Sequence, residues 1–179
     1  MVDPIRAARL AHRLLFVGIV AVLIFIRILP LSSMPSSIPG PDLALGLTLA
    51  WVLRRPDYVP AVTIAGVFLL EDLLFMRPPG LWALIVLAGT EFVRAREVVT
   101  RDLPFLLEWL LIGAVLFGMI FANRLVLEIF MVPQIPLNLV LIHGFTTLVA
   151  YPFVVFFTRY VLGLHRAATG EVDALGHRL

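Results

Sequence analysis

The stretch Gly66–Leu84, which reads GVFLLEDLLFMRPPGLWAL, decides how this chain folds. An apolar run ends on Glu71 and Asp72, a short turn containing Arg77 follows, and the chain then becomes apolar again. A carboxylate at membrane depth is costly to bury, so it normally faces a helix interior, a partner or water. The rest of the chain must therefore provide surroundings that accept these two acids.

The composition predicts a membrane protein. Of 179 residues 61% are hydrophobic and only 15% are charged, and the mean hydropathy is +1.02, which leaves too little polar surface for a soluble domain. All 14 basic residues are arginine, the net charge is +2, and the arginines are scattered between apolar runs. This distribution offers no basic face for nucleic acid. The chain has no cysteine, so neither disulfides nor thiolate metal ligands are available.

Six apolar segments predict an all-α, polytopic helical bundle that forms a single domain over residues 1–179. The expected spans cover residues 10–29, 43–55, 58–75, 80–95, 103–122 and 137–162. The second holds an apolar run of only 11 residues, which is short for a span. Such a helix can still cross if the bilayer thins around it, if the helix is extended or if the bundle buries it. Beyond residue 122 the fifth segment predicts either a helix projecting past the outer face or a short interfacial helix before Pro133.

The arginines predict that both termini lie in the cytoplasm. Eleven of them fall on one side of the six-span layout and three on the other. Cytoplasmic loops are enriched in basic residues, so the richer side is the inner one. Arg27, on the poorer side, is expected to snorkel toward the far interface. We interpret four of the arginines on the richer side as topology signals, with contact to anionic lipids as a secondary effect: Arg54, Arg55, Arg94 and Arg96.

The third segment carries a stripe of small residues and a carboxylate. On a helix Ala61, Ala65, Phe68 and Asp72 lie along one face, where small residues permit close helix approach. Glu71 points about 100° away, so the two acids form a poor acid/base pair. We therefore expect Glu71 to be an interfacial charge.

Three interpretations of Asp72 remain open: a local role through an ion pair with Arg77 or helix packing, direct contact with a partner, and ligand binding. His143 could join Asp72 as a metal ligand, but two candidates do not make a site. The chain contains no zinc-protease HExxH, no GxSxG nucleophile motif and no phosphate-binding loop with a lysine. No catalytic residue, cofactor site or metal site is therefore predicted, and the protein is not expected to be an enzyme.

The order of several residues resembles the rod shape-determining protein MreD family of bacteria. Pro41-Asp42 opens a short helix that Trp51 and Arg55-Pro56 close; Gly66, Asp72-Leu73-Leu74, Pro79-Gly80 and Ala83-Leu84 follow. Tyr151-Pro152 followed by Arg159 is similar to the family's last span. The resemblance extends over residues 10–166.

The resemblance implies a non-enzymatic scaffold in the bacterial inner membrane that binds MreC. It also implies membership of the elongation complex for lateral peptidoglycan synthesis, with RodA, a class B penicillin-binding transpeptidase and MreB, and no cofactor. The implied six-helix fold is similar to the substrate-binding membrane subunits of energy-coupling-factor transporters. Candidate partner-packing or structural residues are Ala61, Ala65, Gly66, Asp72, Pro79 and Gly80.

The alternative function is a small-molecule-binding membrane subunit of a transporter. Such a protein would share the fold, but it would need a polar pocket near the outer side of the membrane. The side chains that could line this pocket are Asp72, Arg77, Asn123, Asn138 and His143.

Overall fold

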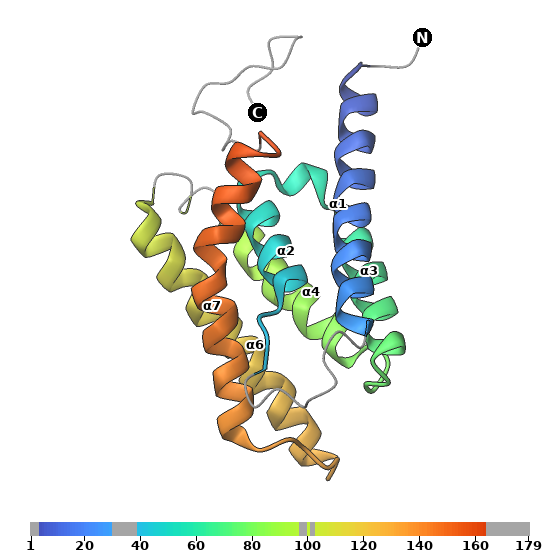
Figure 1. Cartoon of the computed structure of the whole chain (residues 1–179), viewed down its shortest axis with the longest axis vertical. Coiled ribbons are helices and arrows are strands. Elements are labelled where there is room, and N and C mark those ends of the chain that lie inside the picture. Colours follow the sequence, from blue (N-terminus) through green and yellow to red (C-terminus); the bar gives the residue numbers. More distant parts are fainter. Residues whose placement is uncertain (1–3, 30–38, 97–99, 101–102, 164–179) are drawn as a thin grey trace.

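The computed structural model describes residues 4–29, 39–96, 100 and 103–163, and all regular structure in this part of the chain is helical. The α-helices are α1 (Pro4–Ile28), α2 (Leu43–Arg54), α3 (Ala61–Leu74), α4 (Leu81–Arg94), α6 (Phe105–Ile129) and α7 (Leu137–Tyr160), with a short 3-10 turn η1 (Pro56–Tyr58) after α2 (Figure 1). Each predicted segment overlaps one of these helices, and α1 and α6 extend beyond their segments, α1 at its start and α6 at its end. The all-α class is therefore confirmed for the described residues.

Among the described residues, three helices are long and apolar enough to cross a membrane. They are Ala7–Ile28 within α1, together with α6 and α7, Phe105–Ile129 and Leu137–Tyr160. α2, α3 and α4 have 12, 14 and 14 residues, which is fewer than the roughly 20 that a bilayer core requires. α6 continues through Asn123 and Arg124 to Ile129 without a break. The sequence left open a projecting helix or a separate short helix before Pro133, and the structure contains one long helix.

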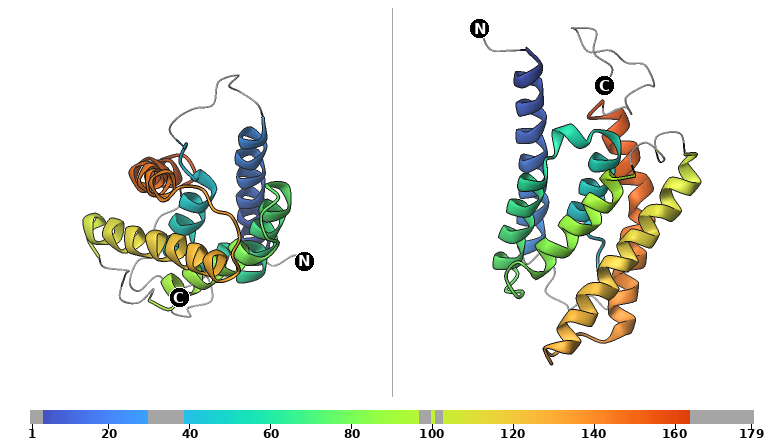
Figure 2. Two further views of the ribbon diagram at one scale, coloured as in Figure 1. Left: turned by 90° about the horizontal axis from the view of Figure 1, so that it is seen from below. Right: turned by 180° about the vertical axis from the view of Figure 1, so that it is seen from behind.

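α2 lies at the centre of the bundle. Eleven of its 12 residues are buried, because α4, α7 and α1 all pack against it (Figure 2). A helix that is apolar on every side is stable only when neighbours cover all of its faces. Its short length is thus compensated by burial inside the bundle, which was one of the alternatives for this segment.

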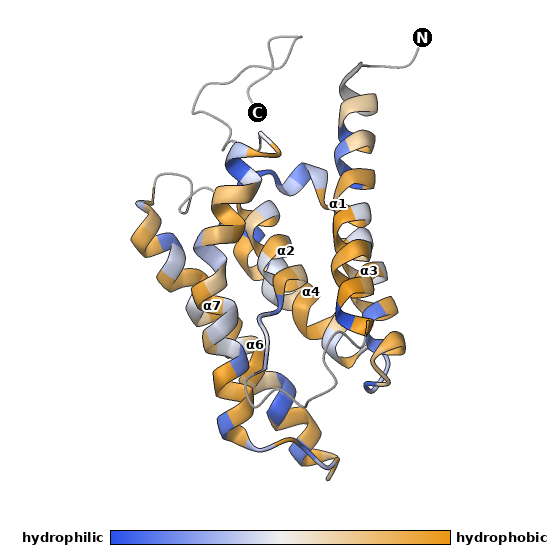
Figure 3. Ribbon diagram, in the orientation of Figure 1, coloured by the Kyte–Doolittle hydropathy of each residue, from blue (hydrophilic) through white to orange (hydrophobic). Residues whose placement is uncertain are grey.

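The surface is dominated by apolar side chains. Val62 is 82% exposed and Phe153 74%, and hydrophobic residues colour most of the ribbon in Figure 3. Such extensive apolar exposure is typical of a surface that contacts lipid or other protein. The beginning of α1 and the end of α7 lie at the same end of the bundle, and α1 and α3 end at the opposite one (Figure 1).

Candidate functional site

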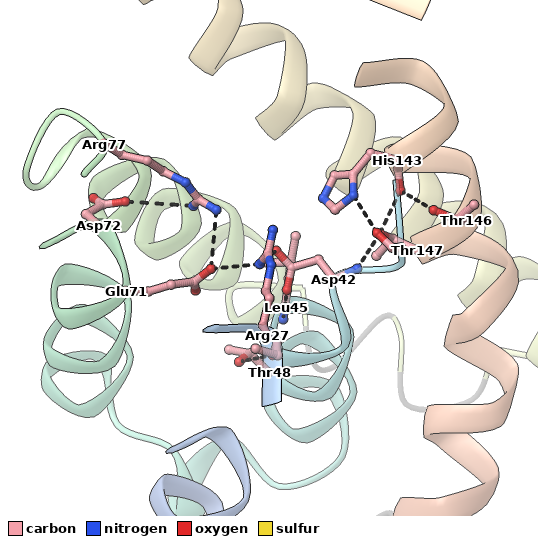
Figure 4. Close-up of polar contacts among 12 residues, drawn as sticks. Arg27, Asp42, Leu45, Thr48, Glu71, Asp72, Arg77, His143, Thr146 and Thr147 are labelled. Carbon is pink, nitrogen blue, oxygen red and sulfur yellow. Dashed lines mark hydrogen bonds and ion pairs between the residues drawn. The ribbon is translucent and has the colours of Figure 1, made fainter. Parts of the chain in front are cut away.

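A cluster of five charged residues forms where the ends of α1 and α3 meet the beginnings of α2 and α4 (Figure 4). Arg27 Nη1 lies 3.0 Å from Glu71 Oε1 and 3.4 Å from Asp42 Oδ2. Arg77 Nη2 lies 3.4 Å from the same Glu71 oxygen, and Arg77 Nη1 lies 3.9 Å from Asp72 Oδ1. The two arginines therefore converge on one carboxylate. We call Arg27, Asp42, Glu71, Asp72 and Arg77 the charge cluster.

Two carboxylates of the charge cluster also accept hydrogen bonds from backbone amides at the starts of helices. Asp42 Oδ1 accepts a hydrogen bond of 3.0 Å from the Leu45 amide in the first turn of α2, so Asp42 caps the start of this helix. Asp72 Oδ2 accepts from the amides of Gly80 and Ala83, at 3.1 and 3.2 Å, at the start of α4. Gly80 has φ of 85°, a left-handed conformation that favours glycine. Asp72 thereby closes the turn between α3 and α4.

Glu71 was predicted to be an interfacial charge, and this prediction is wrong. Its side chain is fully buried between Arg27 and Arg77. Arg27, expected to snorkel outward, turns inward and keeps 37% of its side chain exposed. The sequence contained a signal for this burial, because Ile64, Phe68 and Glu71 share one helix face at spacings of four and three, and all three are buried.

The candidate stripe on α3 faces partly into the bundle. Phe68 and Asp72 are fully buried, and Ala61 and Ala65 are half-buried. Gly66 and Pro79 are exposed, whereas Gly80 is half-buried in the turn. Asp72 makes the ion pair with Arg77 that the first of its three interpretations predicts, and it accepts hydrogen bonds from the amides of Gly80 and Ala83.

A second polar network lies toward the other end of α2. Arg54 Nη2 is 2.9 Å from Glu108 Oε1, and the Tyr151 hydroxyl donates a hydrogen bond of 2.8 Å to the same oxygen. All three side chains are buried, so they join α2, α6 and α7 in the interior. Nothing in the sequence around Tyr151 indicates a polar role for its hydroxyl. The pairing joins residues 43 or more positions apart, so no local spacing indicates it.

The four arginines that were interpreted as topology signals make different contacts in the structure. Arg54 is only 8% exposed and is bound to Glu108, so it does not meet the expectation of lipid contact. Arg94 donates to the carbonyls of Pro56 and Val59 and forms an ion pair with Glu91 at 3.0 Å. The guanidinium carbon of Arg55 lies 6.0 Å from the centre of the Tyr58 ring. Arg96 remains exposed, with its guanidinium carbon 3.6 Å from the centre of the Phe92 ring.

A cavity of about 430 Å³ adjoins the charge cluster, between the start of α4 and the facing parts of α6 and α7. Of the side chains that the transporter alternative requires, Arg77, Asn123 and His143 line it, and Asp72 and Asn138 do not. His143 Nδ1 is 2.7 Å from the Gly40 carbonyl oxygen, which fixes its ring. Among the described residues, no three His, Asp or Glu side chains gather where they could hold a metal ion.

Replacing Asp42 by alanine tests the link between the charge cluster and α2. We expect the free energy of unfolding to fall by about 1 kcal/mol, because the helix loses its side-chain cap. Asp42→Asn retains a capping oxygen and is expected to lose less. Thermal unfolding in detergent measures both, with Asp57→Ala, at an exposed aspartate, as the matched control. Equal losses for Asp42→Ala and Asp57→Ala would show that the cap is unimportant.

The described polar side chains at both ends of α2 are occupied mainly in tying helices together. The charge cluster joins four helices, and the Arg54 network joins three. Such an arrangement fixes the positions of the helices relative to one another. No protein-family model, curated protein or solved structure matches this chain.

Proposed function

We propose that this chain is an MreD-type scaffold of the bacterial inner membrane that binds MreC within the elongation complex for lateral peptidoglycan synthesis. RodA, a class B penicillin-binding transpeptidase and MreB act in the same complex. One observation carries the proposal: several residues on which the resemblance depends bond to one another or belong to the charge cluster. Asp42 begins α2, and Asp72 accepts hydrogen bonds from Gly80 and Ala83. The same kind of contact, a carboxylate bonded to amides at the start of a helix, therefore explains why these residue types occur in this order.

The proposed topology has six membrane-crossing helices, both termini in the cytoplasm, and a fold like that of energy-coupling-factor substrate-binding subunits. Two features support it. The start of α1 and the end of α7 lie at the same end of the bundle (Figure 1), as an even number of crossings requires. The three short helices lie beside the long ones, and α2 is enclosed by its neighbours. Short helices can cross where neighbours shield them and the bilayer thins.

A rigid bundle suits a scaffold because a partner needs a surface of constant shape. The charge cluster holds α1, α2, α3 and α4 at one end, and Arg54 with Glu108 and Tyr151 holds α2, α6 and α7 nearer the other. Phe68 and Asp72 are buried, so they contribute to partner binding by holding α3 in place. The contact with MreC's single span is then made by side chains that α3 and its neighbours leave exposed.

A pull-down of the tagged protein from its own membranes in mild detergent, followed by mass spectrometry, tests the function. We expect MreC to be recovered, with RodA or the transpeptidase. Asp72→Ala is expected to reduce the recovery of MreC several-fold, because α4 loses its side-chain cap and α3 its fixed position. Glu128→Ala, at an exposed acid on α6, is the control and should recover normal amounts. A full membrane level of protein without MreC would contradict the scaffold role.

The alternative, a small-molecule-binding subunit of a transporter, is favoured by one observation, the cavity of about 430 Å³ beside the charge cluster. Pockets of several hundred Å³ are typical of small-molecule sites. The same pull-down separates the two functions. Recovery of an energy-coupling ATPase module in place of MreC would support transport.

A further inference from the structure

The cavity beside the charge cluster has a wall rich in hydrogen-bond donors. Arg27, Arg77 and Arg124 line it, and Asp42 is the one carboxylate among the described residues of its lining. Both Asp42 oxygens are already engaged, Oδ1 by the Leu45 amide and Oδ2 by Arg27. Glu71 and Asp72, the other acids of the charge cluster, are not part of the lining. The surface of the wall therefore presents more donors than acceptors. Glu71 and Asp72 lie behind it and compensate Arg27 and Arg77, so the positive charge left over is that of Arg124.

Two donors of this wall are incompletely paired. The indole N–H of Trp82 has no acceptor, and the guanidinium group of Arg124 has no carboxylate partner among the described residues. Trp82 lines the cavity and is only 9% exposed, and its indole N–H has no hydrogen-bond partner among the described residues. Arg124 donates to the Ile135 carbonyl at 3.1 Å, but no described carboxylate lies within ion-pair distance of it. Arg77 lies next to Trp82, with its guanidinium carbon 5.9 Å from the ring centre. A buried donor without an acceptor is costly, so this wall favours a ligand that brings acceptor oxygens and negative charge.

The other part of the cavity wall is apolar. Ile120, Leu127, Leu139 and Val140 contribute to it, from α6 and α7. Both helices are long and apolar enough to cross a membrane, and Arg124 lies near the end of α6. A basic side chain near the end of such a helix is at the level where lipid headgroups lie. The ligand that matches both walls is an amphiphile with an acidic group at one end.

We propose that this cavity binds the phosphate group of a membrane lipid, with the adjoining hydrocarbon against Ile120, Leu127, Leu139 and Val140. Arg124 and Trp82 donate to phosphate oxygens, and Arg77 and Arg27 supply further donors. Glu71 positions both of these arginines by accepting from each of them through one oxygen. This assignment does not rest on the scaffold function, since either a scaffold or a transporter subunit could hold such a lipid.

Native mass spectrometry of the full-length protein in detergent, titrated with defined lipids, tests the assignment. Phosphatidylglycerol and diacylglycerol with identical acyl chains are compared, because diacylglycerol lacks the phosphate, and inorganic phosphate is added as a competitor. We expect phosphatidylglycerol to bind about tenfold more tightly than diacylglycerol, because one good charge-assisted contact corresponds to roughly that factor. Inorganic phosphate at millimolar concentration should not displace the lipid, because it cannot use the apolar wall.

Three variants locate the binding. Arg124→Gln is expected to weaken phosphatidylglycerol binding about tenfold, and Trp82→Phe, which removes only the indole N–H, about threefold. Arg159→Gln removes the same charge from an exposed position on α7 and should change binding by less than about twofold, since exposed charges are screened. A thermal melt of each variant confirms folding, and Arg124→Lys, which keeps the charge, provides a second test if Arg124→Gln does not fold.

Three results would overturn the assignment. The first is equal affinity for phosphatidylglycerol and diacylglycerol, because the arginines would then not recognise the phosphate. The second is an equal loss in Arg124→Gln and Arg159→Gln, which would indicate diffuse attraction to the whole protein. The third is displacement by inorganic phosphate with the same dependence on Arg124, which would make the cavity a site for a free anion and not for a lipid.

Discussion

Replacing Glu108 by alanine is expected to lower the free energy of unfolding by about 3–5 kcal/mol, because removing one partner of a buried ion pair leaves the other charge uncompensated. Arg54 would lose its carboxylate partner in the interior, where its side chain is only 7% exposed. Tyr151 would lose the acceptor of its hydroxyl at the same time. Three helices meet at this oxygen, so the loss should affect the packing of α2, α6 and α7 together.

Thermal unfolding of purified protein in detergent measures this effect, with Glu128→Ala as the control at an exposed acid on the same helix. The control is expected to change stability by no more than about 0.5 kcal/mol. The double variant Arg54→Met with Glu108→Leu should recover much of the loss, because apolar side chains of similar volume often replace a buried ion pair without penalty. A Glu108→Ala protein as stable as the control would show that the network contributes little to folding.

Replacing Glu71 by glutamine should cost roughly 1.5–3 kcal/mol, the usual range for a hydrogen bond to a charged group. Glu71 is fully buried and accepts from both Arg27 and Arg77 through one oxygen. Glutamine preserves the shape and an acceptor but removes the charge that holds the two guanidinium groups together. The loss should be smaller than that of Glu108→Ala because both arginines are partly exposed and keep Asp42 and Asp72 as partners.

The same unfolding measurement compares Glu71→Gln with Glu128→Gln, which makes an identical chemical change at an exposed position. Addition of salt provides a further check, since ions screen exposed charges far more than buried ones. The difference between the two variants should therefore persist at high salt. A difference that disappears with salt would mean that the Glu71 contacts act as ordinary surface ion pairs.

The sequence alone determined the helical class and the places where helices begin. Local chemistry decides these features: Asp42 follows a proline and caps the next residues, and Pro60, Pro104 and Pro136 each directly precede a helix. Apolar runs between such signals are sufficient to place the helices, because a helix satisfies its own backbone hydrogen bonds. The predicted segments and the observed helices accordingly overlap, although α1 begins at Pro4, before the predicted residue 10, and α6 continues to Ile129, past the predicted residue 122.

Only the tertiary structure decided which charges meet. The helical period brought Ile64, Phe68 and Glu71 onto one face, but it did not show that Arg27, 44 positions away, would turn inward to cover that face. Arg54 and Glu108 are 54 positions apart, and the sequence marks neither as the other's partner. The cavity likewise needs residues from α4, α6 and α7 brought together. Sequence spacing determines the face on which a side chain lies, whereas helix packing determines what lies opposite it.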